Sequence, residues 1–350
     1  MKPTQAIQIA LKVLEGNNTP FFIGGTGIGK SAVINVPIVN ALANGREVVR
    51  DEVNPNKDQY GLLEIRSSLF ESVDFGGLPY IDKHNVQQRA FLGNLPQSGS
   101  GLLFFDEYSQ AHPSLQAVLG QIIYEGRIGD YVLPKGWKVI CAGNRAGDRA
   151  GSNKLPSHVI GRCSIIDFEH DTDDWLAWAG SNDVHQDVAG YISYRQDALN
   201  VFDPKVVSPQ PSPRSWTRLS DTLKTDPPKD LYQLLFATDI GEEQAIEFST
   251  FLSLKDDVPN LKAILTGKKV DVPDKAGLCY ATICAILSVM KDAKDSVIHD
   301  YFSNALAYIE RMPTPEFGIL FVRQIANARA EVKESDSFVK FKVANQDLEI

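Results

Sequence analysis

The chain has 350 residues, of which 43% are hydrophobic and 23% are charged, a composition typical of a globular protein with two domains. No apolar run reaches the roughly 18 residues that span a membrane, so no membrane span is predicted. The formal net charge of −9 argues against binding of nucleic acid by the whole surface, but leaves room for a local basic groove. The four cysteines form no CxxC pair and no zinc-ligand cluster, which favours a reduced, cytoplasmic setting.

Five apolar runs in the first half of the chain are predicted to be buried strands. They cover residues 19–25, 62–66, 101–107, 138–143 and 163–169. Polar or helical sequence follows each run, and this alternation predicts an α/β fold in which a parallel sheet lies between helices. Beyond about residue 170 no strand of this type recurs, and the pattern becomes helical.

The helical half contains several local signals. Three tryptophans at helical positions, Trp175, Trp178 and Trp216, are predicted to belong to its core rather than to stack on bases. Gly241 is predicted to separate two helices, and a turn near residues 332–338 to precede a short final strand. These signals describe packing and assign no chemistry.

The stretch GGTGIGKS follows the first predicted strand and precedes a helix. It fits the phosphate-binding pattern G-x-x-x-x-G-K-[ST] at Gly24, Gly29, Lys30 and Ser31. In such a loop backbone N–H groups surround a phosphate, the lysine reaches the β- and γ-phosphates, and the serine hydroxyl binds Mg²⁺. A dinucleotide loop is excluded because Lys30 stands where its third glycine belongs. The predicted nucleotide-binding residues are Gly24, Gly25, Thr26, Gly27, Ile28, Gly29, Lys30, Ser31 and Ala32.

Two adjacent carboxylates end the third predicted strand, at the sheet edge where open α/β sheets place their ligands. Charge next to a hydrophobic core is costly to desolvate, which favours a chemical role for Asp106 and Glu107. Asp106 is the predicted partner of Ser31 at Mg²⁺. Glu107 is placed to polarise a water molecule for attack on the γ-phosphate.

One asparagine and three arginines complete the candidate set. Asn144 follows the next strand and is predicted to hydrogen-bond the attacking water or the γ-phosphate; the alternative is that it occupies a left-handed turn position. Arg145, Arg149 and Arg162 come next. Arg162 precedes the last strand at the edge of the domain, where it can reach a neighbouring molecule's nucleotide rather than its own.

The series GGTGIGKS, LLFFDE, Asn144, Arg162 and SPRSW resembles the AAA+ ATPases of the MoxR-like and dynein-related branch. VDFGGLPY is similar to the start of the family's helix-2 insert, and YEGRIGDYVLPKGWKVICAGN to the hairpin that leads to its sensor 1 strand. LPSHVIGRC is similar to the family's LP…L-x-R-F motif, with Cys163 where phenylalanine is usual. The resemblance covers residues 5–220.

This resemblance implies a P-loop NTPase AAA+ core with a five-stranded sheet over residues 1–170, a helical lid over 171–255 and a helical extension over 256–350. It also implies ATP and Mg²⁺ as cofactors and assembly into a ring of identical subunits, usually a hexamer. Many such ATPases remodel a protein partner that carries a von Willebrand factor A domain, in the manner of a chaperone. Similar ATPases are often encoded by bacteria and their phages.

Three site residues take their roles from the resemblance. Asn144 corresponds to sensor 1, Arg162 to an arginine finger that acts on the adjacent subunit, and Arg214 in SPRSW to sensor 2 on the lid. Arg149 competes with Arg162 for the intersubunit role. The predicted catalytic residues are Glu107, Asn144, Arg162 and Arg214, and the predicted metal ligands are Ser31 and Asp106.

Functions of other classes are weighed against a protein-remodelling motor. A nucleic-acid translocase on the same core needs basic residues on pore-facing loops, and residues 72–95 and 125–136 supply few of them. A nucleotide-switched binding module has no need of the full catalytic set. A small-molecule kinase needs neither the lid arginine Arg214 nor an arginine finger such as Arg162 at the edge of the domain. An ATP-driven motor that acts on protein is therefore the preferred hypothesis.

Overall fold

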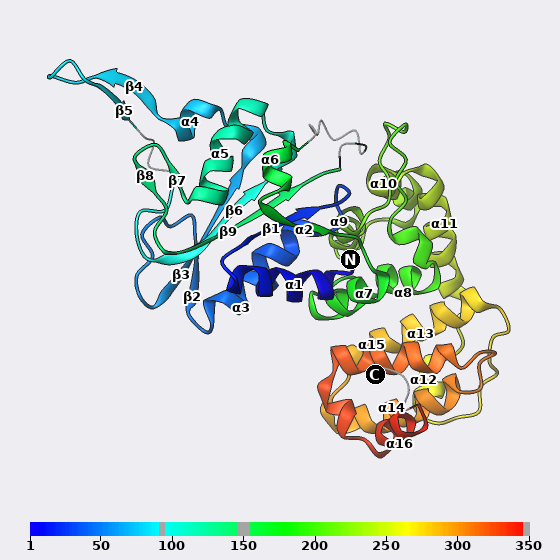
Figure 1. The fold of residues 1–350 in the computed structure, drawn as a ribbon. Helices are drawn as coiled ribbons and strands as arrows, with labels where there is room; N and C mark the ends of the chain where they lie inside the picture. The colour runs from blue at the N-terminus through cyan, green and yellow to red at the C-terminus, as the bar shows by residue number, and fades with distance from the viewer. Residues whose placement is uncertain (91–94, 146, 148–154, 346–350) are drawn as a thin grey trace. The chain divides into compact units, whose positions relative to one another are not determined.

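The computed structural model describes residues 1–90, 95–145, 147 and 155–345. The chain divides into two compact units, unit 1 (Met1–His170) and unit 2 (Asp171–Ile350). Unit 1 is an α/β structure, and the described part of unit 2 is helical (Figure 1). The predicted fold class, an α/β domain with a parallel sheet between helices followed by a helical region, is confirmed. Within those ranges no helix has the length and apolar character needed to cross a membrane.

Unit 1 is built on a six-stranded parallel sheet in the order β10-β1-β9-β6-β3-β2. Its strands are β1 (Thr19–Ile23), β2 (Glu47–Arg50), β3 (Gln59–Arg66), β6 (Ser100–Asp106), β9 (Gly136–Gly143) and β10 (Cys163–Asp167). The five predicted strands are all present, and the short edge strand β2 is an addition to them. Because every pair is parallel, all of these strands end at one edge of the sheet, which we call the carboxyl edge.

Neighbouring residues of the central strands point to opposite faces of the sheet. Phe21 and Phe22 of β1 belong to different hydrophobic clusters, as do Phe104 and Phe105 of β6. The face that holds Phe22 is covered by α1 (Pro3–Glu15), α2 (Lys30–Val33), the π-helix η1 (Ile34–Ile38) and α3 (Val39–Ala43). The other face is covered by α4 (Ser72–Gly76) and α5 (Pro113–Glu125). With both faces covered, the strands are nearly continuous apolar runs.

Short elements outside the main sheet complete unit 1. β4 (Leu78–Ile81) pairs with β5 (Gln87–Ala90) in an antiparallel hairpin that projects from unit 1 in Figure 1. A second hairpin joins β7 (Arg127–Ile128) to β8 (Tyr131–Val132), and it confirms the hairpin expected before β9. The short helix α6 (Ser157–Ile160) precedes β10.

Unit 2 packs its helices around two hydrophobic clusters. The first cluster involves α7 (Thr172–Ser181), α8 (Gln186–Tyr194), α9 (Pro213–Leu223), α10 (Tyr232–Ile240) and α11 (Glu242–Ser253). The second involves α12 (Leu261–Leu265), α13 (Ala276–Lys291), α14 (Asp295–Ile309), α15 (Glu316–Ala328) and α16 (Asp336–Ala344). Helix α13 contributes to both, with Cys284 in the first cluster and Cys279 in the second. A division of this unit at residue 255 stays a prediction.

Two local predictions for α7 to α11 hold and one is wrong. Trp175 and Trp216 are buried, and Gly241 separates α10 from α11 with a φ of 79°. Trp178, however, is 40% exposed and is not part of the core. The reason is helical spacing: Ala179, four residues after Trp175, takes the next buried position of α7.

The predicted final strand is also wrong. Asp336–Ala344 forms helix α16, which begins after the capping side chain of Ser335. Phe338 and Phe341 are buried, and their separation of three residues matches one face of a helix rather than of a strand.

Candidate functional site

The GGTGIGKS loop joins β1 to α2 at the carboxyl edge of the sheet. Gly27 and Gly29 have φ angles of 76° and 101°, in the left-handed region that other residues rarely adopt. Gly24 has a different constraint, since a Cβ there would lie 2.4 Å from the carbonyl oxygen of Phe168. The loop thus exposes backbone without side chains, and this cradle fits a phosphate group.

Replacing Gly24 with alanine is expected to destabilise the protein by about 1–3 kcal/mol, because the added methyl group overlaps the backbone after β10. Gly25→Ala is the matched control, since a Cβ there would meet only the Ile28 side chain, at 3.7 Å. Urea unfolding in nucleotide-free buffer measures both variants. Equal free energies of unfolding for the two variants would contradict the close approach at Gly24.

Lys30, the first residue of α2, is buried and directs its ammonium group into the loop. Its Nζ donates to the carbonyl oxygens of Gly24 and Gly25, at 2.8 and 2.6 Å, and to Oδ1 of Asn144 at 2.8 Å. Three donors therefore meet three oxygens, which offsets the cost of burying the charge. The structure brings Asn144 directly to the predicted phosphate-binding lysine.

Asn144 is fixed through its own backbone. Its N–H donates to Oγ of Ser109 at 2.8 Å, and Ser109 is fully buried. Gly143 allows this contact, because a Cβ there would lie 2.9 Å from Ser109 Oγ. The alternative of a left-handed turn at Asn144 is wrong, since its φ is not positive. Ser109 is not among the residues predicted from the sequence; the only signal was a hydroxyl two residues after Glu107.

Ser31 and Asp106 meet at the same edge. The Ser31 hydroxyl donates to Asp106 Oδ2 at 2.6 Å, and Asp106 Oδ1 accepts from the backbone N–H of Glu107 at 2.8 Å. A hydroxyl and a carboxylate are oxygen ligands of the kind that Mg²⁺ binds together with phosphates and waters. The described residues contain no group of three or more Asp, Glu, His or Cys arranged as an all-protein metal cage. The pair therefore fits a Mg²⁺ ion that arrives with a nucleotide.

Glu107 directly follows Asp106 and has a φ of 53°, which is uncommon for a glutamate. Its Oε2 accepts a hydrogen bond from Oγ of Ser68. Ser68 lies just beyond the carboxyl end of β3, the strand that pairs with β6. This contact selects one orientation of the glutamate carboxylate. Ser68 was not predicted either; its signal was a hydroxyl two residues after the end of the neighbouring strand β3.

Arg162 lies at the edge of the sheet where the strands begin, opposite to the carboxyl edge that holds the loop. It directly precedes β10, whose first residue, Cys163, is in register with Thr19 at the start of β1. At about 3.3 Å per residue, the length of β1 separates this edge from the loop by roughly 16 Å, which exceeds the reach of an arginine side chain. The guanidinium lies over the ring of Tyr124 on α5, with Cζ 4.3 Å from the ring centroid.

The other candidate arginines have different surroundings. Arg145 forms ion pairs with Asp167, at 2.6 Å, and Glu169, at 3.4 Å. Arg149 lies outside the described residues. Arg214 is exposed in the first turn of α9, within unit 2. The residues gathered around the loop are therefore Lys30, Ser31, Asp106, Glu107 and Asn144.

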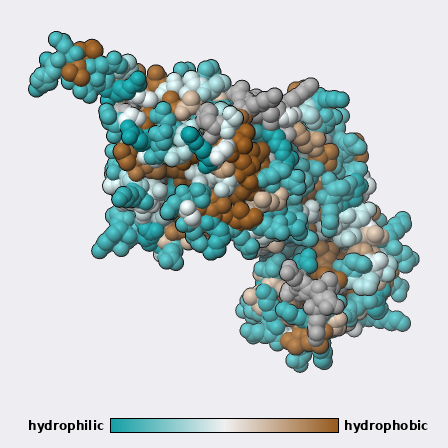
Figure 2. Space-filling view, viewed as in Figure 1, coloured by the Kyte–Doolittle hydropathy of each residue, from teal (hydrophilic) through white to brown (hydrophobic). Residues whose placement is uncertain are grey.

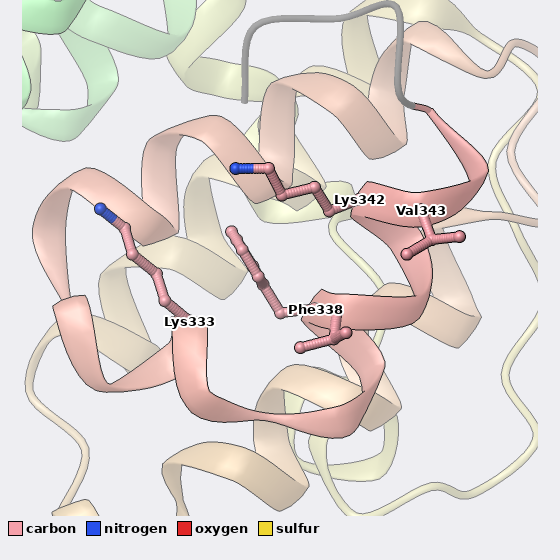
Figure 3. A pocket seen from close by; sticks show the side chains of 5 residues that line it. Lys333, Phe338, Lys342 and Val343 are labelled. Carbon is pink, nitrogen blue, oxygen red and sulfur yellow. The ribbon is translucent and has the colours of Figure 1, made fainter.

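A separate pocket of about 380 Å³ lies in unit 2, on α16 and the segment before it (Figure 3). It is lined by Lys333, Phe338, Val339, Lys342 and Val343. In Figure 3 the two lysines lie on either side of the Phe338 ring. None of these five residues carries a carboxylate or a hydroxyl, so the pocket offers no group that activates water as Glu107 can and no ligand for Mg²⁺.

Comparison with known proteins gives no family assignment. No protein-family model matches the chain, and no curated protein matches it. Similar solved structures include a mutant of RuvB from Thermotoga maritima, at 15% identity and a TM-score of 0.36 over 75% of each chain. Another is NtrX from Brucella abortus in complex with ADP, at 11% identity and a TM-score of 0.40 over 99% of this chain and 68% of that one. Similarities at these scores establish neither a family nor a function for the chain.

Proposed function

We propose that the chain is an AAA+ ATPase that hydrolyses ATP to ADP and phosphate with Mg²⁺. The proposal depends on one observation, the convergence of four side chains at a bare glycine loop: Lys30, Ser31, Asp106 and Asn144. Glu107 adjoins them through its backbone N–H, which donates to Asp106. Each matches a need of phosphoryl transfer. The lysine neutralises phosphate charge, Ser31 and Asp106 hold the metal, and Glu107 and Asn144 orient and activate the attacking water.

The contact between Lys30 and Asn144 explains how substrate can prepare the site. A γ-phosphate oxygen can replace Oδ1 of Asn144 as a partner of the Lys30 ammonium group. The asparagine is then released to hydrogen-bond the attacking water. Because Ser109 holds the Asn144 backbone, only the side chain has to turn.

The proposed enzyme works as a ring of identical subunits, with a hexamer as the expected form. Arg162 supports this part, because it lies about a strand length from its own loop and is available only to the nucleotide of a second copy. Arg214 is proposed to act as sensor 2 from the helical lid, on the nucleotide bound by its own chain. Arg162 rather than Arg149 is proposed as the finger.

The proposed work is chaperone-like remodelling of a protein in the cytoplasm, as in MoxR-type ATPases, with a von Willebrand factor A domain as one kind of partner. The β4–β5 hairpin supports a protein substrate. Four of its apolar side chains are at least half exposed: Leu78, Tyr80, Ile81 and Val86. Figure 2 shows hydrophobic atoms near the far end of this hairpin. Such a surface binds protein better than it binds phosphates.

A nucleic-acid translocase receives less support from the same hairpin. Arg89 donates to the carbonyl oxygens of Gly76 and Gly77, at 2.8 and 3.2 Å, so its guanidinium is engaged by its own chain. Lys83 and His84 are then the remaining basic residues on the described part of the hairpin. That is a small charge for holding a phosphate backbone.

Phosphate release and mass in solution, measured over a range of protein concentrations with ATP and Mg²⁺, test the proposal. We expect turnover per subunit to rise with assembly and to vanish in EDTA. Full activity in a monomer would contradict the shared site, and absence of hydrolysis at every concentration would contradict the ATPase. Stimulation by a captured protein supports the remodelling role, whereas stimulation by single-stranded DNA supports the translocase.

A further inference from the structure

The guanidinium of Arg162 is held by an aromatic ring rather than by an acid. Its Cζ lies 4.3 Å from the ring centroid of Tyr124, the penultimate residue of α5. No carboxylate among the described residues pairs with Arg162, in contrast to Arg145, which is ion-paired twice. One guanidinium N–H also donates to the Tyr124 hydroxyl oxygen, and the other N–H donors are available to an anion.

Tyr124 is itself held in a defined place. A Cβ at Gly120, one turn earlier on α5, would lie 2.3 Å from the Tyr124 hydroxyl oxygen, so the ring lies back along the helix over this glycine. Burial raises the pKa of Tyr124, and the positive charge of Arg162 opposes that rise. The ring is a platform that belongs to a helix, whereas Arg162 stands in the turn between α6 and β10.

Two exposed apolar residues lie close to Arg162 in the chain. Ile160 is 49% exposed and Ile165 is 36% exposed, on either side of Arg162 in the chain. Figure 2 shows hydrophobic atoms gathered on unit 1 near the place where Figure 1 labels α6. Exposed apolar side chains near an arginine that carries further N–H donors fit an interface with a second copy of this chain.

We propose that Tyr124 is a positioning residue, which holds Arg162 in the orientation that reaches the triphosphate bound by a second copy of the chain. This inference rests on the proposed function and extends it to the residue that orients the finger. The platform reduces the number of conformations that an exposed arginine must lose when it contacts the transferring phosphate.

Two substitutions separate the ring from its hydroxyl group. Tyr124→Leu removes the aromatic face and is expected to lower kcat for ATP hydrolysis by about tenfold, with KM and ATP binding unchanged. Tyr124→Phe keeps the face and is expected to retain at least about half of wild-type kcat. Tyr301→Leu, which replaces a partly buried tyrosine of α14, is the matched control and should leave kcat unchanged.

Mixed assemblies distinguish a positioning role from a folding defect. Tyr124→Leu subunits keep an intact loop, and Lys30→Ala subunits keep an intact Tyr124 and Arg162. Their mixture should hydrolyse ATP faster than the sum of the two alone, which a misfolded variant cannot achieve. Wild-type kcat in Tyr124→Leu, equal losses in the Phe and Leu variants, or no gain on mixing would overturn the inference. An inactive Arg162→Ala variant together with a fully active Tyr124→Leu variant would contradict only the positioning role of Tyr124. A fully active Arg162→Ala variant would also contradict the proposed active site shared between two subunits.

Discussion

Replacing Glu107 with glutamine is expected to abolish turnover while ATP still binds. Glutamine has nearly the same shape, and its carbonyl oxygen can still accept the hydrogen bond from Ser68. The amide, however, cannot take a proton from the attacking water, and loss of a general base lowers turnover by about 10²–10⁴-fold. Ser31, Asp106 and Lys30 are unchanged, so the affinity for Mg²⁺ and ATP should be preserved. Phosphate release and equilibrium binding of a fluorescent ATP analogue measure the two quantities.

A matched glutamate elsewhere in unit 1 controls for the change in charge. Glu15 is exposed on α1 and pairs with Lys12 at 2.7 Å, so Glu15→Gln should leave both quantities unchanged. The assembled form of Glu107→Gln should also persist in ATP, because the bound nucleotide is not consumed. Wild-type turnover in Glu107→Gln would mean that another group activates the water, and loss of ATP binding would mean that the carboxylate supports the loop.

The central strands can be predicted from the sequence because helices cover both faces of the sheet. β1 and β6 contain runs of buried residues with almost no polar interruption. The edge strand β2 escapes such a prediction, since it has one neighbour and its end residues Glu47 and Arg50 are exposed. Helix α16 misleads for the opposite reason: valines, phenylalanines and lysines alternate over part of its length as in a strand, although Phe338 and Phe341 follow a helical spacing.

The loop is predictable because its constraints are local, and the residues that support the site are not. The left-handed φ angles of Gly27 and Gly29 and the position of Lys30 all follow from one short stretch. Ser68 and Ser109 matter only because of sheet order, which places β3 and β9 on either side of β6. A serine after a strand is common, and the sequence does not say which strand lies beside it.

The position of Arg162 follows from topology once β10 is known to be parallel to β1. A residue that directly precedes a parallel strand must lie at the edge opposite to residues that follow one. Arg162→Ala is therefore expected to bind ATP normally and to lose about 10³–10⁵-fold in turnover, the contribution of an arginine finger. Lys12→Ala, which removes an exposed cation from α1, is the control for net charge and should leave turnover unchanged.

Mixing Arg162→Ala with Lys30→Ala subunits gives the sharpest result. Consider a randomly mixed ring with equal amounts of the two variants. About one subunit interface in four then joins the intact loop of an Arg162→Ala subunit to the intact arginine of a Lys30→Ala subunit. ATP turnover per subunit interface should thus recover to about a quarter of the wild-type value, although each variant alone is inactive. A site contained within one chain predicts no recovery at any ratio, because no subunit of either kind is complete. The dependence of turnover on the mixing ratio, with a maximum at equal amounts, distinguishes the two arrangements without knowledge of the subunit count or of the partner.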